Sequence, residues 1–156
     1  MEKNKITQAL IDQLTSEVSK QKEIVDDSKA LQTHQDLKSE GKYDTRAIEA
    51  GYLADAQRKR LEELELDLQM LQEIPNENTT SIQIGSLAEL SHAGQTRWYF
   101  FSPNCGGTIL SIDGITVLVI SVFSPLGNEA VGLSVGDEFT IETPKEERVY
   151  NVVSVR

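Results

Sequence analysis

Apolar positions in the first half of the chain recur at alternating steps of three and four residues, the spacing of one helix face. One stripe comprises Ala47, Ala50, Ala54, Gln57, Leu61, Leu64, Leu68 and Leu71. A looser stripe upstream comprises Ile6, Leu10, Leu14, Val18, Gln21, Val25 and Ser28. The first of these is a heptad seam with a polar lapse at Gln57. The pattern predicts two long helices that bury these faces.

The two striped segments have similar lengths, about 28 residues each, or about 42 Å of helix at 1.5 Å per residue. Matched lengths favour two helices packed antiparallel within one chain, which reverses around Gln35–Asp44. Neither helix can bury its stripe alone, so packing provides most of the stability. Internal pairing also favours a monomer. The alternative is an intermolecular coiled coil, in which the same faces pair between chains.

Strand formers and turn residues dominate the second half of the chain. All four prolines and eight of the ten glycines lie from Pro75 onward. Asp113-Gly114 between two apolar runs predicts a β-hairpin. Ser124–Gly127 predicts a turn, followed by a short helix at Asn128–Leu133. Six strands are expected, at Ser81–Leu90, Thr96–Phe101, Thr108–Ile112, Ile115–Ser121, Glu138–Glu142 and Arg148–Val155.

These elements predict an α+β chain with three parts. Residues 1–75 form an antiparallel coiled-coil hairpin, residues 76–80 a polar linker, and residues 81–156 a small domain with an antiparallel sheet. The predicted core of that domain comprises Phe100, Ile109, Val117, Val119, Phe139 and Val152.

Composition and charge narrow the classes of function. The chain has 15 Lys and Arg against 25 Asp and Glu, a net charge of −10. It therefore lacks the basic footprint of proteins that bind nucleic acid by neutralising phosphates. No apolar run approaches the roughly 18 residues that a membrane span needs, and no secretion leader is evident. A cytoplasmic protein with no membrane partner is expected, and its one cysteine excludes an internal disulfide.

Motifs for catalysis by the chain itself are missing from the sequence. There is no nucleotide loop, zinc-ligand spacing or nucleophile motif. Cys105 has no histidine near it in sequence, so a structural role is expected. His34 and His92 are interpreted as ordinary surface or packing residues. The aromatic run Trp98–Phe101 alternates between two strand faces and favours core packing over a pocket.

The predicted reversal between the helices carries three carboxylates, those of Asp36, Glu40 and Asp44. Oxygen ligands of this kind suit Mg²⁺, which keeps several waters and usually binds substrate phosphates as well. A tip of this composition would work best by completing a metal site that is half built elsewhere. The simpler interpretation is a solvated turn.

Several motifs resemble the GreA/GreB family of bacterial transcript-cleavage factors. The most specific is Ser124-Pro125-Leu126-Gly127, which continues into Gly132–Phe139; family members carry a similar Ser-Pro-(Leu/Ile) turn and a Val-Gly-Asp strand start. Further matches are Ile84-Gly85-Ser86, Ser102-Pro103 with Gly106-Gly107, and Tyr150–Val155. Asp36-Leu37-Lys38 with Tyr43 resembles the family's tip, Gly-Asp-Leu-x-Glu-Asn-x-Glu-Tyr.

The resemblance implies an FKBP-like sheet domain that docks on bacterial RNA polymerase at the rim of its secondary channel, through Pro125, Leu126 and Gly127. It implies that the hairpin enters the channel. Asp36 and Glu40, with Asp44, would then help to hold a second Mg²⁺ that is shared with the polymerase and not bound by this protein alone. The backtracked RNA would be cut near its 3′ end by the polymerase, so this protein would be an accessory factor and not an enzyme.

Family members also use basic patches on the hairpin to touch RNA, and Arg58-Lys59-Arg60 is the basic triplet of this chain. A solvated helix face is the alternative for these residues, because they spread over about 200° of the helix.

The tip departs from the family pattern. When the family's tip motif is aligned on Asp36 and Tyr43, its second acidic position falls on Ser39. Glu40 lies one place later, and Gln35 stands where the family has glycine. The alternative function is therefore a secondary-channel regulator that binds polymerase without promoting cleavage. A prolyl isomerase or chaperone is suggested only by the implied FKBP-like fold, which does not carry activity by itself.

Overall fold

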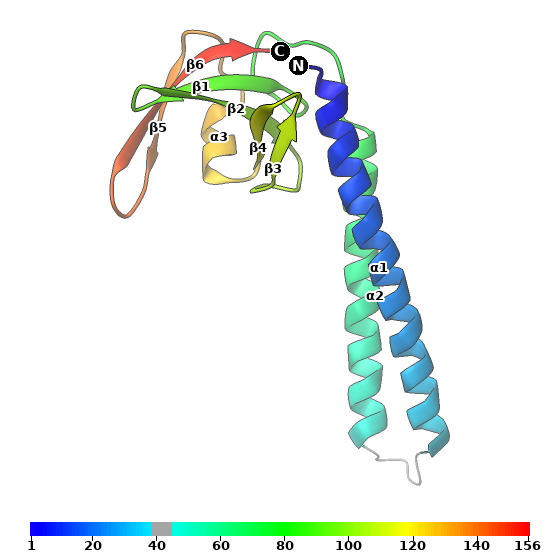
Figure 1. Cartoon of the computed structure of the whole chain (residues 1–156). Coiled ribbons are helices and arrows are strands. Elements are labelled where there is room, and N and C mark those ends of the chain that lie inside the picture. Colours follow the sequence, from blue (N-terminus) through cyan, green and yellow to red (C-terminus); the bar gives the residue numbers. More distant parts are fainter. Residues whose placement is uncertain (39–44) are drawn as a thin grey trace. The chain divides into compact units, whose positions relative to one another are not determined.

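The computed structural model describes residues 1–38 and 45–156, apart from the side chains of residues 32–38. The described chain separates into two compact units, one formed by Met1–Ile11 with Met70–Arg156 and the other by Asp12–Gln69. Figure 1 labels the elements of both units. Over the described ranges, no helix is long and apolar enough to cross a membrane. The domain boundaries proposed from composition, at residues 75 and 81, stay a prediction.

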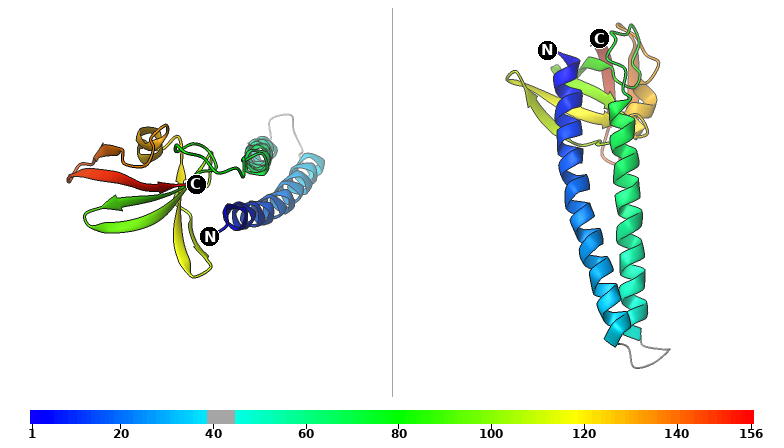
Figure 2. Two further views of the ribbon diagram at one scale, coloured as in Figure 1. Left: turned by 90° about the horizontal axis from the view of Figure 1, so that it is seen from above. Right: turned by 90° about the vertical axis from the view of Figure 1, so that its right-hand side faces the viewer.

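Two helices provide the whole of the second unit, α1 (Lys3–Lys38) and α2 (Thr45–Gln72). They run side by side in opposite directions, as Figures 1 and 2 both show. The buried side chains of this unit all come from the predicted stripes, namely Leu14, Val18, Gln21, Ala54 and Leu64. The predicted helical hairpin and its packing faces are therefore confirmed.

Polar residues in the two stripes pair with one another. The Gln21 Nε2 donates to the Gln57 Oε1 at 2.8 Å and to the Gln57 backbone carbonyl at 2.9 Å. The polar residue Gln57, which interrupts the apolar stripe, thus forms a hydrogen-bonded layer with Gln21 between the helices. Such a layer disfavours alternative registers, because a shifted pairing would leave a buried amide without its partner.

The first helix is longer than predicted. It has 36 residues, whereas α2 has the expected 28. Gln35–Lys38, where the reversal was expected to begin, belong to α1. No glycine or proline interrupts these four positions, and the first glycine of the chain is Gly41. The helix propensities of these four residues therefore give no reason for α1 to end before Lys38.

Six strands form one sheet in the first unit, in the order β3-β4-β2-β1-β6-β5. Their bounds are Leu87–His92 (β1), Gln95–Ser102 (β2), Ile109–Ile112 (β3), Ile115–Ser121 (β4), Glu138–Glu142 (β5) and Glu147–Val155 (β6). Asp113 and Gly114 both have positive φ, 52° and 79°, which is the geometry of a tight hairpin turn. The predicted hairpin between β3 and β4 is therefore confirmed.

The sheet differs from the prediction at one pair of neighbours. Four of its five pairings are antiparallel, but β2 and β4 run parallel. The cause is the intervening hairpin strand: the chain leaves β2, forms β3 at the sheet edge and returns beside β2 as β4. Pairing order of this kind cannot be read from the length and pattern of single strands.

The first predicted strand is also shorter than expected. Of Ser81–Leu90, only the part from Leu87 onward pairs as β1. Gly85 has φ +88°, which turns the chain just before the strand. Ser81 makes only an isolated bridge to Ser134.

Both faces of the sheet bury side chains. A core on the face that carries α3 (Pro125–Ala130) includes Ala88, Leu90, Tyr99, Phe101, Phe139, Tyr150 and Val152. On the opposite face, Phe100, Val117 and Val119 are fully buried. The predicted core is therefore confirmed except at Ile109, which is 66% exposed. That prediction was wrong: β3 is an edge strand with one neighbouring strand, and its Ile109 is left uncovered, whereas Phe139 on the other edge strand, β5, is buried.

Candidate functional site

Of the predicted metal-supporting acids, only Asp36 lies within the described residues. Asp36 is in the last turn of α1, and its backbone alone is described. Glu40 and Asp44, together with Ser39, lie outside the described residues. The end of α1 and the start of α2 lie at the same end of the pair (Figure 1). Across the part of the chain that the structure describes, no cluster of three or more His, Cys, Asp or Glu could hold a metal ion.

The position of Asp36 has an electrostatic consequence. The last turn of a helix carries the partial negative charge of the helix dipole, so a carboxylate is disfavoured there and a cation is favoured. A Mg²⁺ ion bound near the end of α1 would relieve that repulsion. Carboxylate oxygens are also the ligand type that this ion prefers.

The predicted docking residues form a helix start and not a free turn. Pro125, Leu126 and Gly127 are the first turn of α3, which begins earlier than the predicted Asn128. Ser124 caps the helix: its Oγ accepts from the Gly127 N–H at 3.1 Å and donates to the Ser121 carbonyl at 2.7 Å. Proline suits the first helical position, because its missing N–H would have no helical partner there.

These three residues differ in what they offer to a partner. Pro125 is exposed, Leu126 packs half-buried against the core, and Gly127 is buried. A Cβ on Gly127 would lie 2.1 Å from the Ser121 carbonyl oxygen, so α3 can approach the end of β4 only with glycine here. Pro125 is thus accessible to solvent, whereas Gly127 allows α3 to pack closely against the end of β4.

The basic triplet lies on the solvent side of α2. The Arg58 Nη2 is 2.8 Å from the Asp55 Oδ1, and the Arg60 Nη1 is 3.8 Å from the Glu63 Oε2. Exposed pairs of this kind contribute little to stability, but they partly neutralise the two guanidinium groups. The geometry favours a solvated face, and the RNA contact stays a prediction.

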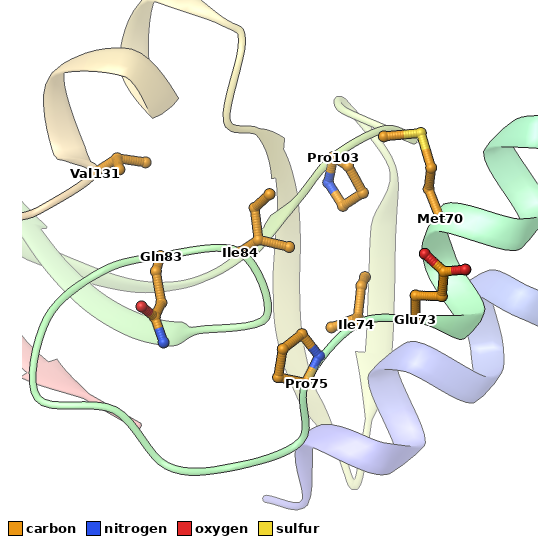
Figure 3. Close-up of a pocket in the computed structure, with 8 residues that line it drawn as sticks. All are labelled: Met70, Glu73, Ile74, Pro75, Gln83, Ile84, Pro103 and Val131. Atoms are coloured by element: carbon orange, nitrogen blue, oxygen red, sulfur yellow. The ribbon is translucent and has the colours of Figure 1, made fainter.

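An apolar pocket of about 600 Å³ lies in the first unit. We call it the apolar pocket; its lining is Met70, Glu73, Ile74, Pro75, Gln83, Ile84, Pro103 and Val131. Figure 3 shows these side chains arriving from the end of α2, from the segments on either side of β1 and β2, and from the end of α3. The sequence did not predict this pocket, because its lining comes from segments that are far apart in the chain and no motif indicates that they meet.

A second pocket, of about 400 Å³, lies beside the start of α3. We call it the basic pocket, since two arginines and a histidine line it: Arg97, Arg148 and His92. The His92 Nδ1 lies 2.9 Å from the Val149 carbonyl, and its ring stacks on Tyr150 with centroids 4.8 Å apart. His92 was expected to be an ordinary surface or packing residue, and here its ring packs on Tyr150. Its place beside two arginines was not predicted, because they come from different strands.

Comparison with known proteins identifies the C-terminal part of the chain. Residues 113–156 match the family model described as transcription elongation factor, GreA/GreB, C-terminal. The matched stretch contains β4, α3, β5 and β6. The resemblance to the GreA/GreB family is thereby confirmed over these residues. Among curated proteins, none matches the chain.

Solved structures that match the chain include two proteins from Thermus. The GreA factor homolog Gfh1 of Thermus thermophilus is 20% identical over 94% of each chain, with a TM-score of 0.39. Gfh1 of Thermus aquaticus is 22% identical over 92% of each chain, with a TM-score of 0.41. A GreA/GreB elongation factor from Nitrosomonas europaea is 21% identical over 61% of this chain and 78% of its own, with a TM-score of 0.38.

Proposed function

We propose that this protein is a transcription elongation factor that binds bacterial RNA polymerase and stimulates the cleavage of backtracked RNA. The observation that carries the proposal is the match of residues 113–156 to the C-terminal domain of GreA/GreB elongation factors. That stretch includes the first turn of α3, where Pro125 is exposed for docking. The protein supplies no active site of its own and acts on the polymerase's catalytic centre.

The helical pair would provide the length needed to extend into the polymerase. The 28 residues of α2 extend over about 42 Å, enough for a narrow rod to enter the secondary channel of the polymerase. Asp36 and Glu40, with Asp44 nearby, would offer carboxylate oxygens to a Mg²⁺ shared with the polymerase. When bound, that second ion would stabilise charge on the attacking and leaving oxygens of the RNA phosphate.

A stalled, backtracked elongation complex tests this function. We expect shortened RNA when the complex is incubated with the protein and Mg²⁺. Asp36→Asn should reduce cleavage to the level seen without the protein, while binding to polymerase, measured separately, is retained. Asp26→Asn is the matched control, because Asp26 is an exposed carboxylate earlier on the same helix. Full cleavage with Asp36→Asn would remove Asp36 from the mechanism.

The alternative function is a secondary-channel regulator that does not promote cleavage. Its motivating feature is Ser39, which stands where the resemblance places the second acid. Without that carboxylate a shared Mg²⁺ has one oxygen ligand fewer. This alternative predicts slowed elongation or altered initiation with RNA of unchanged length. It also predicts that Ser39→Glu introduces cleavage that the unaltered chain lacks.

A further inference from the structure

Half of the basic residues in the second half of the chain line the basic pocket. Beyond residue 75 the chain has four Lys and Arg against nine Asp and Glu. Two of the four, Arg97 and Arg148, line this pocket. A third, Arg156, lies over the Trp98 ring, 5.3 Å from its centroid. In an acidic part of the molecule, a concave surface with two arginines is a local site for negative charge.

A carboxylate already lies against one of these arginines. The Arg148 Nε donates to the Glu146 Oε1 at 2.8 Å, and both side chains are about half exposed, 45% and 55%. The Arg97 Nη2 donates to the Gln95 Oε1 at 3.3 Å. A guanidinium has five N–H donors, so each arginine can bind a further oxygen beside these contacts. Glu146 shows the type of group that the pocket accepts.

The rest of the pocket is apolar or neutral. Leu118, Ile120 and Leu126 line it and are half-buried. Tyr99 also lines it, and burial raises the pKa of its phenol above the usual value, so this hydroxyl stays uncharged at neutral pH. A ligand therefore meets arginines and an aliphatic surface in one cavity.

We propose that the basic pocket binds an acidic peptide segment of a partner protein. A carboxylate side chain pairs with Arg97 and Arg148, and an adjacent aliphatic side chain packs on Leu118, Ile120 and Leu126. Charged hydrogen bonds of this kind are shorter and stronger than neutral ones. The pocket includes Leu126 of α3, which is also one of the predicted docking residues. The test below uses peptides and no polymerase, so it can fail while the proposed function stands.

A nucleic acid is disfavoured as the ligand. Binding to a phosphate backbone uses several basic residues along a stripe, whereas this pocket has two arginines and contains Glu146. The net charge of −10 also repels a polyanion. A short peptide with one or two carboxylates needs fewer cationic partners than a phosphate backbone, and it is repelled less because it carries less charge.

Nuclear magnetic resonance of the ¹⁵N-labelled full chain tests the proposal. The probes are the peptides acetyl-Leu-Glu-Glu-Leu-amide and, as the uncharged control, acetyl-Leu-Gln-Gln-Leu-amide. We expect the acidic peptide to shift amide signals of residues 92–99, 118–126 and 146–150, and to bind about tenfold more tightly than the control.

Variants separate this site from general charge effects. Arg148→Gln and Arg97→Gln should each weaken binding of the acidic peptide about fivefold or more. Glu146→Gln should tighten it, because the competing carboxylate is removed. Arg58→Gln is the matched control: Arg58 is also half exposed and also pairs with a carboxylate at 2.8 Å, but it lies on α2. It should leave the affinity unchanged.

Three results would overturn the proposal. The first is equal affinity for the two peptides, and the second is no shift of these amides up to about 10 mM peptide, a concentration that detects even weak binding. The third is a stronger shift of the same amides by inorganic phosphate or by a single-stranded RNA oligonucleotide. Should one arginine variant unfold, the other variant and Glu146→Gln still decide the outcome.

Discussion

Gly127 is a residue at which helix propensity and packing oppose each other. Alanine normally stabilises a helix by about 1 kcal/mol relative to glycine. Here the added methyl group would meet backbone atoms of β4 and the following residue, 2.1 Å from the Ser121 oxygen and 2.8 Å from the Val122 Cα. We expect Gly127→Ala to lower the free energy of unfolding by about 3 kcal/mol. Urea denaturation measures this.

The matched control for that substitution is the next residue on the same helix. Asn128 is exposed, so Asn128→Ala should change the free energy of unfolding by at most about 0.5 kcal/mol. Equal stability of the two variants would show that α3 can move away from β4 without cost.

Tyr99 links stability to alkaline pH. Burial, first, and the neighbouring Tyr150, second, raise the pKa of its phenol above 10.0. Unfolded tyrosine therefore releases its proton at a lower pH than folded Tyr99. The stabilisation is fully present below pH 10 and is lost as pH rises through the folded pKa. Urea denaturation at about pH 8 and about pH 10.5 should show a smaller loss for Tyr99→Phe than for the unaltered chain. An identical loss would contradict this assignment.

At the scale of single residues, the sequence predicts burial correctly on the central strands but on only one of the two edge strands: Phe139 on β5 is buried, and Ile109 on β3 is not. Phe100 and Val119 lie on central strands and are fully buried, whereas Ile109 on the edge is exposed. All three are equally apolar. Their burial differs because of where each strand lies and what packs on its faces, which the sequence pattern does not contain.

The helical pair depends on its hydrogen-bonded layer as well as on its apolar stripes. Gln21→Leu or Gln57→Leu alone leaves an amide group facing a side chain that cannot bond to it, and should cost about 1 kcal/mol. The double variant replaces the layer with an apolar contact and should recover most of that loss. A double-mutant cycle by urea denaturation should therefore give a coupling energy of about 1.5 to 2 kcal/mol. Additive single effects would mean that the two side chains do not interact in solution.

Leu64 and Leu66 test which face of α2 carries the packing. Leu64 is 4% exposed and Leu66 is 58% exposed, two residues apart on one helix. Leu64→Ala should lower the free energy of unfolding by about 2 to 5 kcal/mol, while Leu66→Ala should change it by at most about 0.5 kcal/mol. Thermal denaturation would rank them, and equal effects would reject the predicted seam.

At the scale of elements, periodicity predicts the helices, and turn chemistry predicts one hairpin. β4 and β5 begin and end where the sequence places them, at Ile115–Ser121 and Glu138–Glu142. The start of α3 was missed because Ser124-Pro125 suits both a turn and a capped helix start. The parallel β2–β4 pair was missed because pairing order depends on the whole sheet.

At the scale of the whole molecule, the stripes of α1 and α2 satisfy each other within one chain. Gln21 and Gln57 bond inside it, and the other buried stripe residues lie at the same interface. We therefore expect a monomer of 17.3 kDa in sedimentation equilibrium, with no dependence on concentration. A concentration-dependent dimer would favour the intermolecular coiled coil.

The candidate sites could be predicted from the sequence only where their residues are contiguous in the chain. Sequence motifs single out the candidate docking residues Pro125–Gly127 and the candidate acids from Asp36 onward, because each set is a contiguous run. The basic pocket is assembled from residues as far apart as His92 and Tyr150, and only the sheet brings them together.

The position of β6 between β1 and β5 has a consequence for how the molecule is made. β5 has no neighbour in the sheet other than β6, and β1 gains its second neighbour only when β6 arrives. While the chain is being synthesised, α1 and α2 emerge first and can pair early. The sheet stays incomplete until Val155 has left the ribosome. We therefore expect a nascent stage in which the helices can pair while strand edges are still open, and open edges are prone to aggregation.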